Sequence, residues 1–276
     1  MSAIELRRIF KVFGEHEARA MQMLREGADK SAVLQRCGCT VGVHDVSLSI
    51  ASGEIFVIMG LSGSGKSTLV RHFNRLIEPS SGEILVGGRD VLKLDAAGLR
   101  SLRRHDMSMV FQSFGLMPHK TVLDNVGYGL SVRGEKGTQV AAAAHRWIER
   151  VGLNGYAAKY PDELSGGMRQ RVGLARALAV DASILLMDEA FSALDPLIRR
   201  DMQDLLLELQ ASLRKTIVFI THDIDEALRI GQRIAILRDG RLVQVGTPAE
   251  ILQRPADDYV RRFVDKRVEI EPACPS

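Results

Sequence analysis

Continuous apolar runs and alternating runs divide this chain into elements of different kinds. Residues 184–187 and 217–220 are apolar at every position, which is typical of parallel strands buried on both faces. Helical segments such as 197–213 alternate with these runs, and that order predicts a parallel sheet covered by helices on both sides. Further strands are predicted at 4–14, 43–50, 54–59, 107–111 and 234–237, and the alternation in 82–90 predicts a hairpin.

Three other stretches have a different texture. Residues 15–27 predict one helix that ends at Gly27, and residues 29–36 predict a second, for which Asp29 and Ser31 are both possible N-caps. Residues 121–160 predict a mostly helical subdomain inserted between two parts of a sheet domain. The end of the chain, 268–276, has two prolines and no period, so we expect it to fray.

Composition limits the class of protein. The 276 residues suffice for one large α/β domain or two small ones, and 46% hydrophobic with 26% charged residues suits a soluble globular protein. No apolar stretch approaches the roughly 20 residues that a spanning helix needs. The N-terminus lacks the apolar core of a signal peptide, so a cytoplasmic location is predicted. A net charge of +3 gives little support for a nucleic-acid partner.

The cysteines carry little information about function. The chain has Cys37, Cys39 and Cys274, and an odd count in an unexported chain favours reduced thiols. The pair Cys37 and Cys39 could form half of a metal site. No second Cys/His pair occurs at ligand spacing, so incidental thiols are the favoured interpretation.

Residues 60–68 form a glycine-rich segment between an apolar run and a helix-like run, 69–76. Strand, glycine-rich loop and helix together are typical of a phosphate-binding loop, in which backbone N–H groups and the helix N-terminus face phosphate oxygens. Lys66 would reach the β- and γ-phosphates and the Ser67 hydroxyl would ligate Mg²⁺. A flexible Gly/Ser turn would need neither Lys-Ser-Thr at its end nor a strand before it. The predicted nucleotide-binding residues here are Gly60, Leu61, Ser62, Gly63, Ser64, Gly65, Lys66, Ser67 and Thr68.

A second group of motifs follows later in the chain. Residues 164–171 place a serine and two glycines before the helical run 172–179, which is typical of an anion cradle or of a simple helix cap. The apolar strand 184–187 is followed by Asp188 and Glu189. Asp188 is placed to hold Mg²⁺ and Glu189 to polarise an attacking water, although two such carboxylates could also be surface charges. A phosphate-binding loop in the same chain favours the catalytic interpretation.

In this order the motifs resemble those of the ATP-binding subunits of ABC transporters, and the resemblance covers nearly the whole chain. Residues 111–114 match the Q-loop and 164–171 the signature. Residues 192–195 match the D-loop, and 221–223 contain the switch histidine. Taken singly, a glutamine after a strand is usually a polar loop residue and a lone histidine is usually structural.

The resemblance implies a role for each matching residue. Glu189, His222 and Gln112 would be catalytic, and Ser67, Gln112 and Asp188 would hold Mg²⁺. Ser165, Gly166 and Gly167 would bind the γ-phosphate of ATP held by the opposite subunit, and Asp195 would lie across the dimer interface. Phe13, which precedes Gly14 near the first strand, would stack on adenine, although it could also be a core phenylalanine.

The fold that the resemblance implies is α/β, a P-loop NTPase of ABC type. It has a RecA-like parallel-sheet core, an antiparallel β subdomain and an inserted α-helical subdomain. One ABC ATPase domain would cover 1–276. The sheet core and β subdomain would take 4–118 and 180–250, the helical subdomain with the signature 119–179, a family-type helical insert 15–42, and a C-terminal helix and tail 251–276.

Within that family the chain is most similar to the importer ATPases for glycine betaine, proline and related compounds, through the insert 15–42 and the runs 53–79 and 160–199. The resemblance implies ATP and Mg²⁺ as cofactors, a homodimer, an integral-membrane permease and, indirectly, a substrate-binding protein. Residues 117–119 would lie near the groove for the permease. The subunit would be peripheral, on the cytoplasmic face of the inner membrane, with a solute of the glycine betaine, proline, choline or histidine class. Fuller members continue into a pair of CBS modules, so regulation of that sort is not expected here.

Three other functions share part of this pattern. A non-transport ABC ATPase acting on nucleic acid or ribosomes would have the same nucleotide site, but long coiled-coil or zinc-bearing inserts and a second ATPase domain do not occur in this sequence. A nucleotide-dependent binding module without hydrolysis would not need both Glu189 and His222. A P-loop kinase would have no reason to carry residues 164–171.

Overall fold

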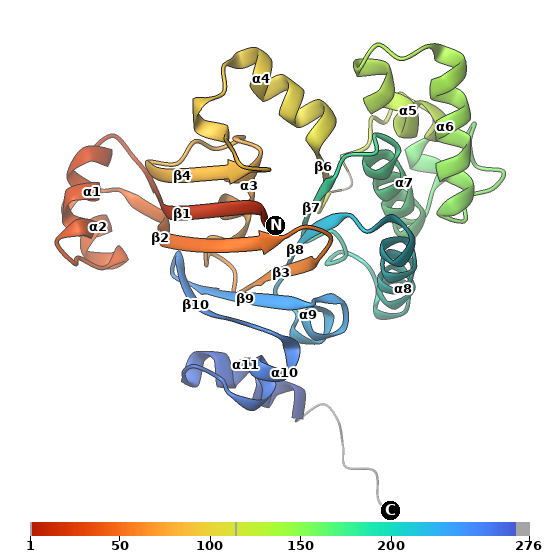
Figure 1. Cartoon of the computed structure of the whole chain (residues 1–276). Coiled ribbons are helices and arrows are strands. Elements are labelled where there is room, and N and C mark those ends of the chain that lie inside the picture. The colour runs from red at the N-terminus through yellow and green to blue at the C-terminus, as the bar shows by residue number, and fades with distance from the viewer. Residues whose placement is uncertain (1, 114, 269–276) are drawn as a thin grey trace, which may run out of the picture. The chain divides into compact units, whose positions relative to one another are not determined.

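The structure is a computed structural model that describes residues 2–113 and 115–268. The chain forms two compact units, one of Met1–Asp95 and Ile220–Ser276 and the other of Ala96–Phe219. Figure 1 follows their elements along the chain from red to blue. Because the two units each contain a separate part of the predicted site, each is described by itself.

The first unit contains an antiparallel sheet with the order β2-β1-β4-β5. Pairs such as Ile4 with Ile50 and Leu6 with Leu48 place apolar side chains on its buried face. Gly87 and Gly88 both have positive φ in the tight turn between β4 and β5, which confirms the predicted hairpin. The strands of this sheet are β1 (Ser2–Phe13), β2 (Thr40–Ala51), β4 (Ser81–Val86) and β5 (Arg89–Asp90).

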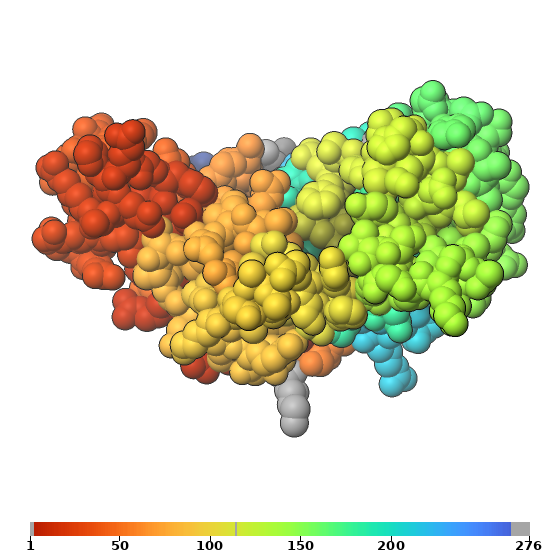
Figure 2. Space-filling view, turned by 90° about the horizontal axis from the view of Figure 1, so that it is seen from above, coloured from red at the N-terminus to blue at the C-terminus, as the bar shows by residue number. Residues whose placement is uncertain are grey.

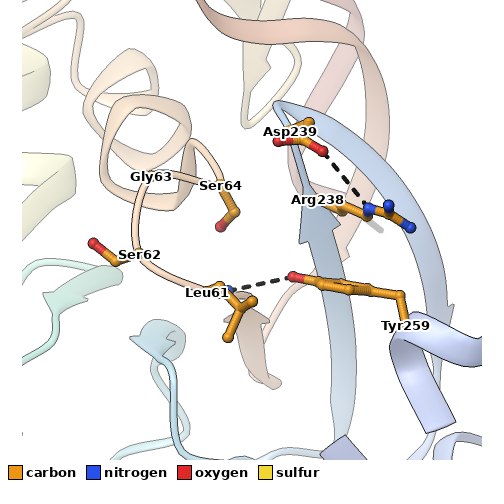
Figure 3. A pocket seen from close by; sticks show the side chains of 7 residues that line it. All are labelled: Leu61, Ser62, Gly63, Ser64, Arg238, Asp239 and Tyr259. Atoms are coloured by element: carbon orange, nitrogen blue, oxygen red, sulfur yellow. Dashed lines mark hydrogen bonds and ion pairs between the residues drawn. The ribbon is translucent and has the colours of Figure 1, made fainter. Parts of the chain in front are cut away.

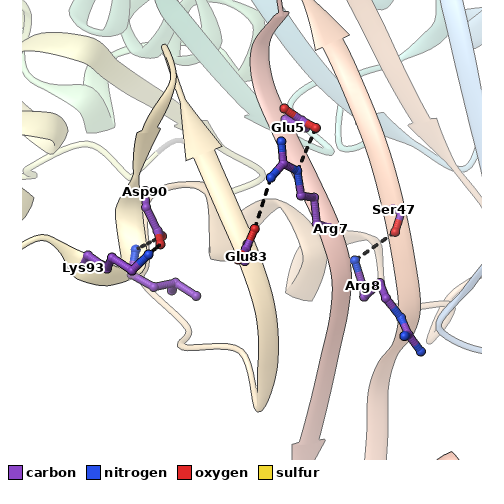
Figure 4. Close-up of polar contacts among 8 residues, drawn as sticks. Glu5, Arg7, Arg8, Ser47, Glu83, Asp90 and Lys93 are labelled. Carbon is purple, nitrogen blue, oxygen red and sulfur yellow. Dashed lines mark hydrogen bonds and ion pairs between the residues drawn. The ribbon is translucent and has the colours of Figure 1, made fainter.

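The outer face of this sheet carries charged pairs in register (Figure 4). The Arg7 guanidinium donates to Glu5 at 2.9 Å and, across the strands, to Glu83 at 3.3 Å, and Glu5 raises the pKa of Arg7. The backbone N–H of Arg8 donates to Ser47 Oγ at 2.8 Å. These contacts are exposed to solvent, where opposite charges across strands favour one register but add little stability.

The first unit also contains three strands of a second, six-stranded sheet, which are neighbours in the order β10-β9-β3. Strand β3 (Ile55–Met59) is buried at every position and runs parallel to β9 (Arg233–Arg238), and both lie where strands are predicted at 54–59 and 234–237. Strand β10 (Arg241–Gly246) is antiparallel to β9. The accompanying helices are α3 (Lys66–Phe73), α9 (Ile224–Ile230), α10 (Pro248–Gln253) and α11 (Asp258–Val268), and a short 3₁₀ turn covers Val91–Lys93.

The predicted pair of N-terminal helices is present as α1 (Glu17–Arg25) and α2 (Lys30–Cys37), red in Figures 1 and 2. Asp29 is the N-cap of α2, since its carboxylate accepts from Ala32 N at 2.7 Å, whereas the Ser31 hydroxyl donates to Asp29. Gly27 has φ +92° just after α1, as expected of a helix stop.

The two helices enclose a small core of their own against β1 and β2. Its buried members include Ala20, Leu24 and Val33. The thiols of Cys37 and Cys39 are also buried there, with Cys37 Sγ 3.2 Å from Met23 Sδ. Cys274 lies outside the described residues.

The second unit combines parallel strands in the order β8-β7-β6 with a helical cluster. Helices α5, α6 and α7 pack on one another through apolar residues such as Val126, Ile148 and Val172, which agrees with the helical texture of 121–160. The elements are α4 (Ala96–Ser101), a π-helical turn (Leu102–Asp106), β6 (Met107–Phe111), α5 (Val122–Val132), α6 (Gly137–Arg150), a 3₁₀ turn (Pro161–Glu163), α7 (Gly166–Ala179), β7 (Ile184–Asp188), α8 (Pro196–Leu213) and β8 (Thr216–Thr221), along which the chain passes back to the first unit.

The structure also bears on the predicted absence of a membrane-spanning helix and on the end of the chain. Within residues 2–113 and 115–268, every helix is too short or too polar to span a lipid bilayer. The predicted frayed end, 268–276, lies outside the described residues apart from Val268 at the end of α11.

Candidate nucleotide-binding site

The phosphate-binding segment is a tight loop between the end of β3 at Met59 and the start of α3 at Lys66. Its glycines are required by the backbone. Gly60 has φ +156° and Gly65 φ +99°, and a Cβ on either would collide with a backbone carbonyl, that of Leu237 or that of Gly42. The loop therefore takes a curvature that only glycine permits at these positions.

Lys66 lies inside the loop rather than in solvent. Its side chain is buried, and Nζ donates to the carbonyls of Gly60 at 2.9 Å and Leu61 at 3.1 Å. Ser64 Oγ is also buried and has no hydrogen-bond partner among the described residues. A buried ammonium, a hydroxyl with unused hydrogen-bonding capacity and the N-terminus of α3 together suit a phosphate group, which would give both side chains oxygen partners.

Residues distant in the sequence hold the loop from outside. Gly240 N donates to Ser64 O at 3.0 Å, and Leu61 N donates to the Tyr259 hydroxyl at 3.4 Å. Figure 3 shows Tyr259 and the turn after β9 on the outer side of the loop. They border a cavity of about 290 Å³ lined by Leu61, Ser62, Gly63, Ser64, Arg238, Asp239 and Tyr259. Sequence reasoning missed Tyr259, because nothing local links α11 to the loop.

Phe13 lies at the far side of the same loop. A Cβ built on Gly42 would be 2.8 Å from the Phe13 ring and 3.3 Å from the Thr68 methyl group, so the ring and the start of α3 border one small space. The ring is 40% exposed, which is more than a core phenylalanine shows. Lys11 Nζ is 5.1 Å from the ring centroid. The structure thus leaves part of the ring face accessible beside the loop.

His222 also belongs to the first unit, directly after β8. It is exposed, and the residues around it form a regular helix start: Asp223 N donates to Thr221 Oγ1 at 3.0 Å, and the Asp223 carboxylate caps α9. These bonds fix the backbone on the C-terminal side of His222, and they thereby restrict the position of its side chain.

The acidic pair is in the second unit, at the end of β7. Asp188 is only 5% exposed, and Glu189 has φ +47°, a left-handed conformation that is costly for a residue with a Cβ. Ser192 supports this conformation, because its N–H and hydroxyl donate to the Glu189 carbonyl at 3.1 and 2.9 Å.

Ser192 also connects the acidic pair to the Q-loop. Gln112 Nε2 donates to Ser192 Oγ at 3.2 Å, so one hydroxyl links the glutamine that follows β6 to the backbone of Glu189. Sequence reasoning placed Ser192 in a motif but gave it no function. A serine three residues after the glutamate was the only signal that could have indicated this link.

The signature and the D-loop are helix starts in the second unit. Ser165 caps α7 by accepting from Met168 N at 3.3 Å, and Asp195 caps α8 by accepting from Ile198 N at 3.1 Å. A Cβ on Gly167 would lie 2.6 Å from Ile198 Cγ2, so close packing between the two helices requires glycine there. Both interpretations of residues 164–171, a helix cap and an anion cradle, therefore fit this geometry.

The structure distributes the predicted site residues over the two units. Residues 60–68, Phe13 and His222 lie in the first unit, whereas Gln112, Ser165, Gly166, Gly167, Asp188, Glu189 and Asp195 lie in the second. Within the first unit it brings Phe13 beside Thr68, and within the second it connects Gln112 to Glu189 through Ser192.

The chain is similar to known proteins in its sequence and in its structure. The family model described as ABC transporter matches residues 43–192. The chain is 58% identical over 260 residues to the glycine betaine/proline betaine transport system ATP-binding protein ProV of Escherichia coli (strain K12), covering 94% of this chain and 65% of ProV. It is 54% identical to the glycine betaine transport ATP-binding protein OpuAA of Bacillus subtilis (strain 168), covering 95% and 63%. It is 51% identical to the trimethylamine N-oxide transport system ATP-binding protein TmoW of Ruegeria pomeroyi, covering 95% and 77%.

The chain spans slightly less than two thirds of the length of ProV and OpuAA. Among solved structures it is similar to a dimeric, post-hydrolysis state of the ATP-binding cassette MJ0796 bound to ADP and Pi. The TM-score is 0.74 at 31% identity, and the match covers 89% of this chain and 98% of that one.

Proposed function

Because the chain belongs to the ABC transporter family, we propose that it binds and hydrolyses ATP to power uptake of a small solute through a membrane permease. One observation carries the proposal: the glycine-rich loop closes around a buried Lys66 at the start of α3. A buried ammonium that donates to backbone carbonyls of its own loop is poised to exchange them for phosphate oxygens.

Binding of ATP would use residues of the first unit. Lys66 would pair with the β- and γ-phosphates, and the loop Gly60–Thr68 would surround them with backbone N–H groups. The accessible face of Phe13 would stack on adenine, since an aromatic ring offers a π-surface to a base. His222 would contact the γ-phosphate.

Three oxygen donors would hold Mg²⁺: the Ser67 hydroxyl, the Asp188 carboxylate and the Gln112 side-chain oxygen. Hard oxygen ligands of this kind are those that Mg²⁺ prefers. When bound, the ion supplies charge neutralisation to the phosphates.

Hydrolysis would depend on Glu189 as the general base that takes a proton from the attacking water. The bond from Ser192 to the Glu189 carbonyl supports this role, because it stabilises a backbone conformation that would otherwise be costly. Through the same hydroxyl, Gln112 would be oriented with respect to Glu189.

The remaining motif residues would act on a second copy of the chain. Ser165, Gly166 and Gly167 would contact the γ-phosphate on the partner, and Asp195 would lie at the interface. Two ATP molecules would then favour a closed dimer and hydrolysis an open one. The dimeric state of the similar cassette MJ0796 supports this arrangement.

The names of the relatives support the solute class. Glycine betaine, proline betaine and trimethylamine N-oxide are the solutes that their names give. We therefore favour an N-methylated zwitterion of the glycine betaine type, with a cationic nitrogen and an anionic oxygen, over proline, choline or histidine. The subunit would sit on the cytoplasmic face of the inner membrane against its permease, with a substrate-binding protein delivering the solute.

ATP hydrolysis by the purified chain over a range of protein concentrations tests this proposal. Activity should rise faster than linearly with concentration, and Glu189→Gln should abolish it while forming an ATP-bound dimer in size-exclusion chromatography. Glu149→Gln, which changes an exposed glutamate of α6 in the same way, should behave as wild type. Linear activity that does not depend on Glu189 would contradict the two-chain mechanism.

The solute is tested separately. Vesicles that contain the chain with its permease and binding protein should show ATP-dependent uptake of labelled glycine betaine. Excess histidine should not compete for that uptake. Competition by histidine but not by unlabelled glycine betaine would assign the other solute class.

A further inference from the structure

The peptide group between Gly60 and Leu61 is bonded to side chains on both of its edges. The Gly60 carbonyl accepts from Lys66 Nζ at 2.9 Å, and the Leu61 N–H donates to the Tyr259 hydroxyl at 3.4 Å. This is the first peptide of the phosphate loop. Its orientation therefore depends on Lys66 inside the loop and on Tyr259 of α11, whose bond to Leu61 is drawn in Figure 3.

The Tyr259 hydroxyl is itself held in place. It donates to the Leu237 carbonyl at 3.2 Å, so it accepts from the loop and donates to the end of β9 at once. A tyrosine hydroxyl is protonated at neutral pH and can donate, and burial raises the pKa of this phenol further. The Leu237 carbonyl in turn lies against Gly60, where a Cβ would collide with it.

The ring of Tyr259 is fixed by two further contacts. It meets Phe263 edge-on at 5.2 Å between centroids, and the Arg238 guanidinium lies 5.1 Å from its centroid. Phe263 is on the same helix, whereas Arg238 ends β9. These contacts leave the hydroxyl little freedom to follow the loop if the loop moves.

We propose that Tyr259 is a positioning residue for the nucleotide site, and that it holds the Gly60–Leu61 peptide in the orientation that nucleotide binding requires. The inference rests on the proposed function. When Lys66 turns to the phosphates, its bonds to the Gly60 and Leu61 carbonyls are lost. The bond to Tyr259 then remains to keep this peptide in place, at a glycine whose backbone is otherwise free to rotate.

The proposed role of Tyr259 predicts which kinetic parameter changes when its hydroxyl is removed. Tyr259 contacts the backbone of the loop and no reacting atom, so it stabilises bound ATP and the transition state equally. Such uniform binding changes KM and leaves kcat unaltered. A shift of α11 would change ATP affinity by the same route.

Tyr259→Phe tests the proposal, since it removes the hydroxyl and keeps the ring contacts to Phe263 and Arg238. We expect KM for ATP to rise about three- to tenfold, the effect of losing the one neutral hydrogen bond between the hydroxyl and the loop, with kcat changed less than about twofold. Tyr156→Phe makes the same chemical change at a 39% exposed position of the second unit and should leave KM unaltered.

Phe263→Leu is the second variant, because it loosens the ring and keeps the hydroxyl. It should lower Tm and raise KM less than Tyr259→Phe does. Equal KM increases in both variants, or an unchanged KM in Tyr259→Phe, would overturn the proposal. If the wild type itself neither binds nor hydrolyses ATP, the proposed function fails; if it does both and Tyr259→Phe matches it, only this inference fails.

Discussion

The phosphate loop of the first unit and the acidic end of β7 in the second unit keep their backbone conformations in different ways. In the loop, glycines take the positive φ values, and the one buried charge, Lys66, is satisfied by carbonyls of the loop itself. At the end of β7 the positive φ falls on Glu189, and an external hydroxyl, that of Ser192, supports its carbonyl.

From this difference we expect the loop to determine nucleotide binding and the end of β7 to determine hydrolysis. The loop keeps its shape through bonds among its own residues and through bonds to Gly240 and Tyr259, as a preorganised ligand site does. The end of β7 keeps Glu189, the proposed general base, in a costly conformation, which is common at functional sites and persists only where surrounding bonds determine it. Changes in the loop should therefore alter nucleotide affinity first, and changes around Glu189 should alter turnover first.

The largest effect is expected for Lys66→Ala. Removing the ammonium deprives the β- and γ-phosphates of their charge partner, so ATP affinity and hydrolysis should each fall by about 100-fold or more. Calorimetric titration with ATP and a steady-state assay measure the two quantities. Lys136→Ala, at an exposed lysine before α6, is the control and should change neither. Normal ATP affinity in Lys66→Ala would contradict the role of the loop.

Local patterns in the sequence predicted the loop and the strands around it. The apolar run before Gly60, the glycine spacing and the helix-like run after Thr68 are contiguous, so no long-range information was needed. The solved neighbour confirms the predicted ABC-type P-loop fold, and the family model confirms the family. The roles of the individual site residues stay predictions.

Contacts between distant segments were not predictable. Tyr259 contacts the loop from α11, and Gln112 donates to Ser192, which lies 80 residues later in the chain. No periodicity or spacing in the sequence predicts either of these long-range contacts. The choice between Asp29 and Ser31 as the cap of α2 also needed the side-chain geometry, since both residue types suit that position. The amino-acid composition of Leu102–Asp106 does not predict that this segment forms a π-helical turn.

A smaller effect is expected for Ser192→Ala, which tests the second half of the comparison. Loss of the hydroxyl removes the bond to the Glu189 carbonyl and the acceptor for Gln112, so kcat should fall about three- to tenfold while KM for ATP stays within twofold. Ser212→Ala is a matched control, because that hydroxyl also donates to a carbonyl, Leu209 O at 3.0 Å, within the same unit. A raised KM with normal kcat would show that the region around Glu189 contributes to binding instead.

The smallest effect concerns stability rather than activity, and it too distinguishes the two units. Among the described residues the buried imidazoles are His44 and His72, both in the first unit. Burial lowers the pKa of His72 below its ordinary value, and its Nδ1 lies 2.7 Å from the Ile77 carbonyl. Below about pH 6.5 the unfolded chain therefore binds more protons than the folded chain, so stability is present above that pH and is lost as the pH falls.

Urea unfolding followed by circular dichroism at pH 7.5 and 5.5 checks this prediction. The wild type should lose about 1 kcal/mol between these pH values for each imidazole kept neutral. His72→Leu should show a smaller loss whatever its absolute stability, and His105→Leu, at an exposed histidine of the second unit, should keep the wild-type loss. Fluorescence of Trp147, the single tryptophan of the chain, reports on the second unit during the same titration. A pH effect that is identical in His72→Leu would show that protonation of His72 does not destabilise the folded chain, and His44, the other buried imidazole of the first unit, would be the next residue to replace.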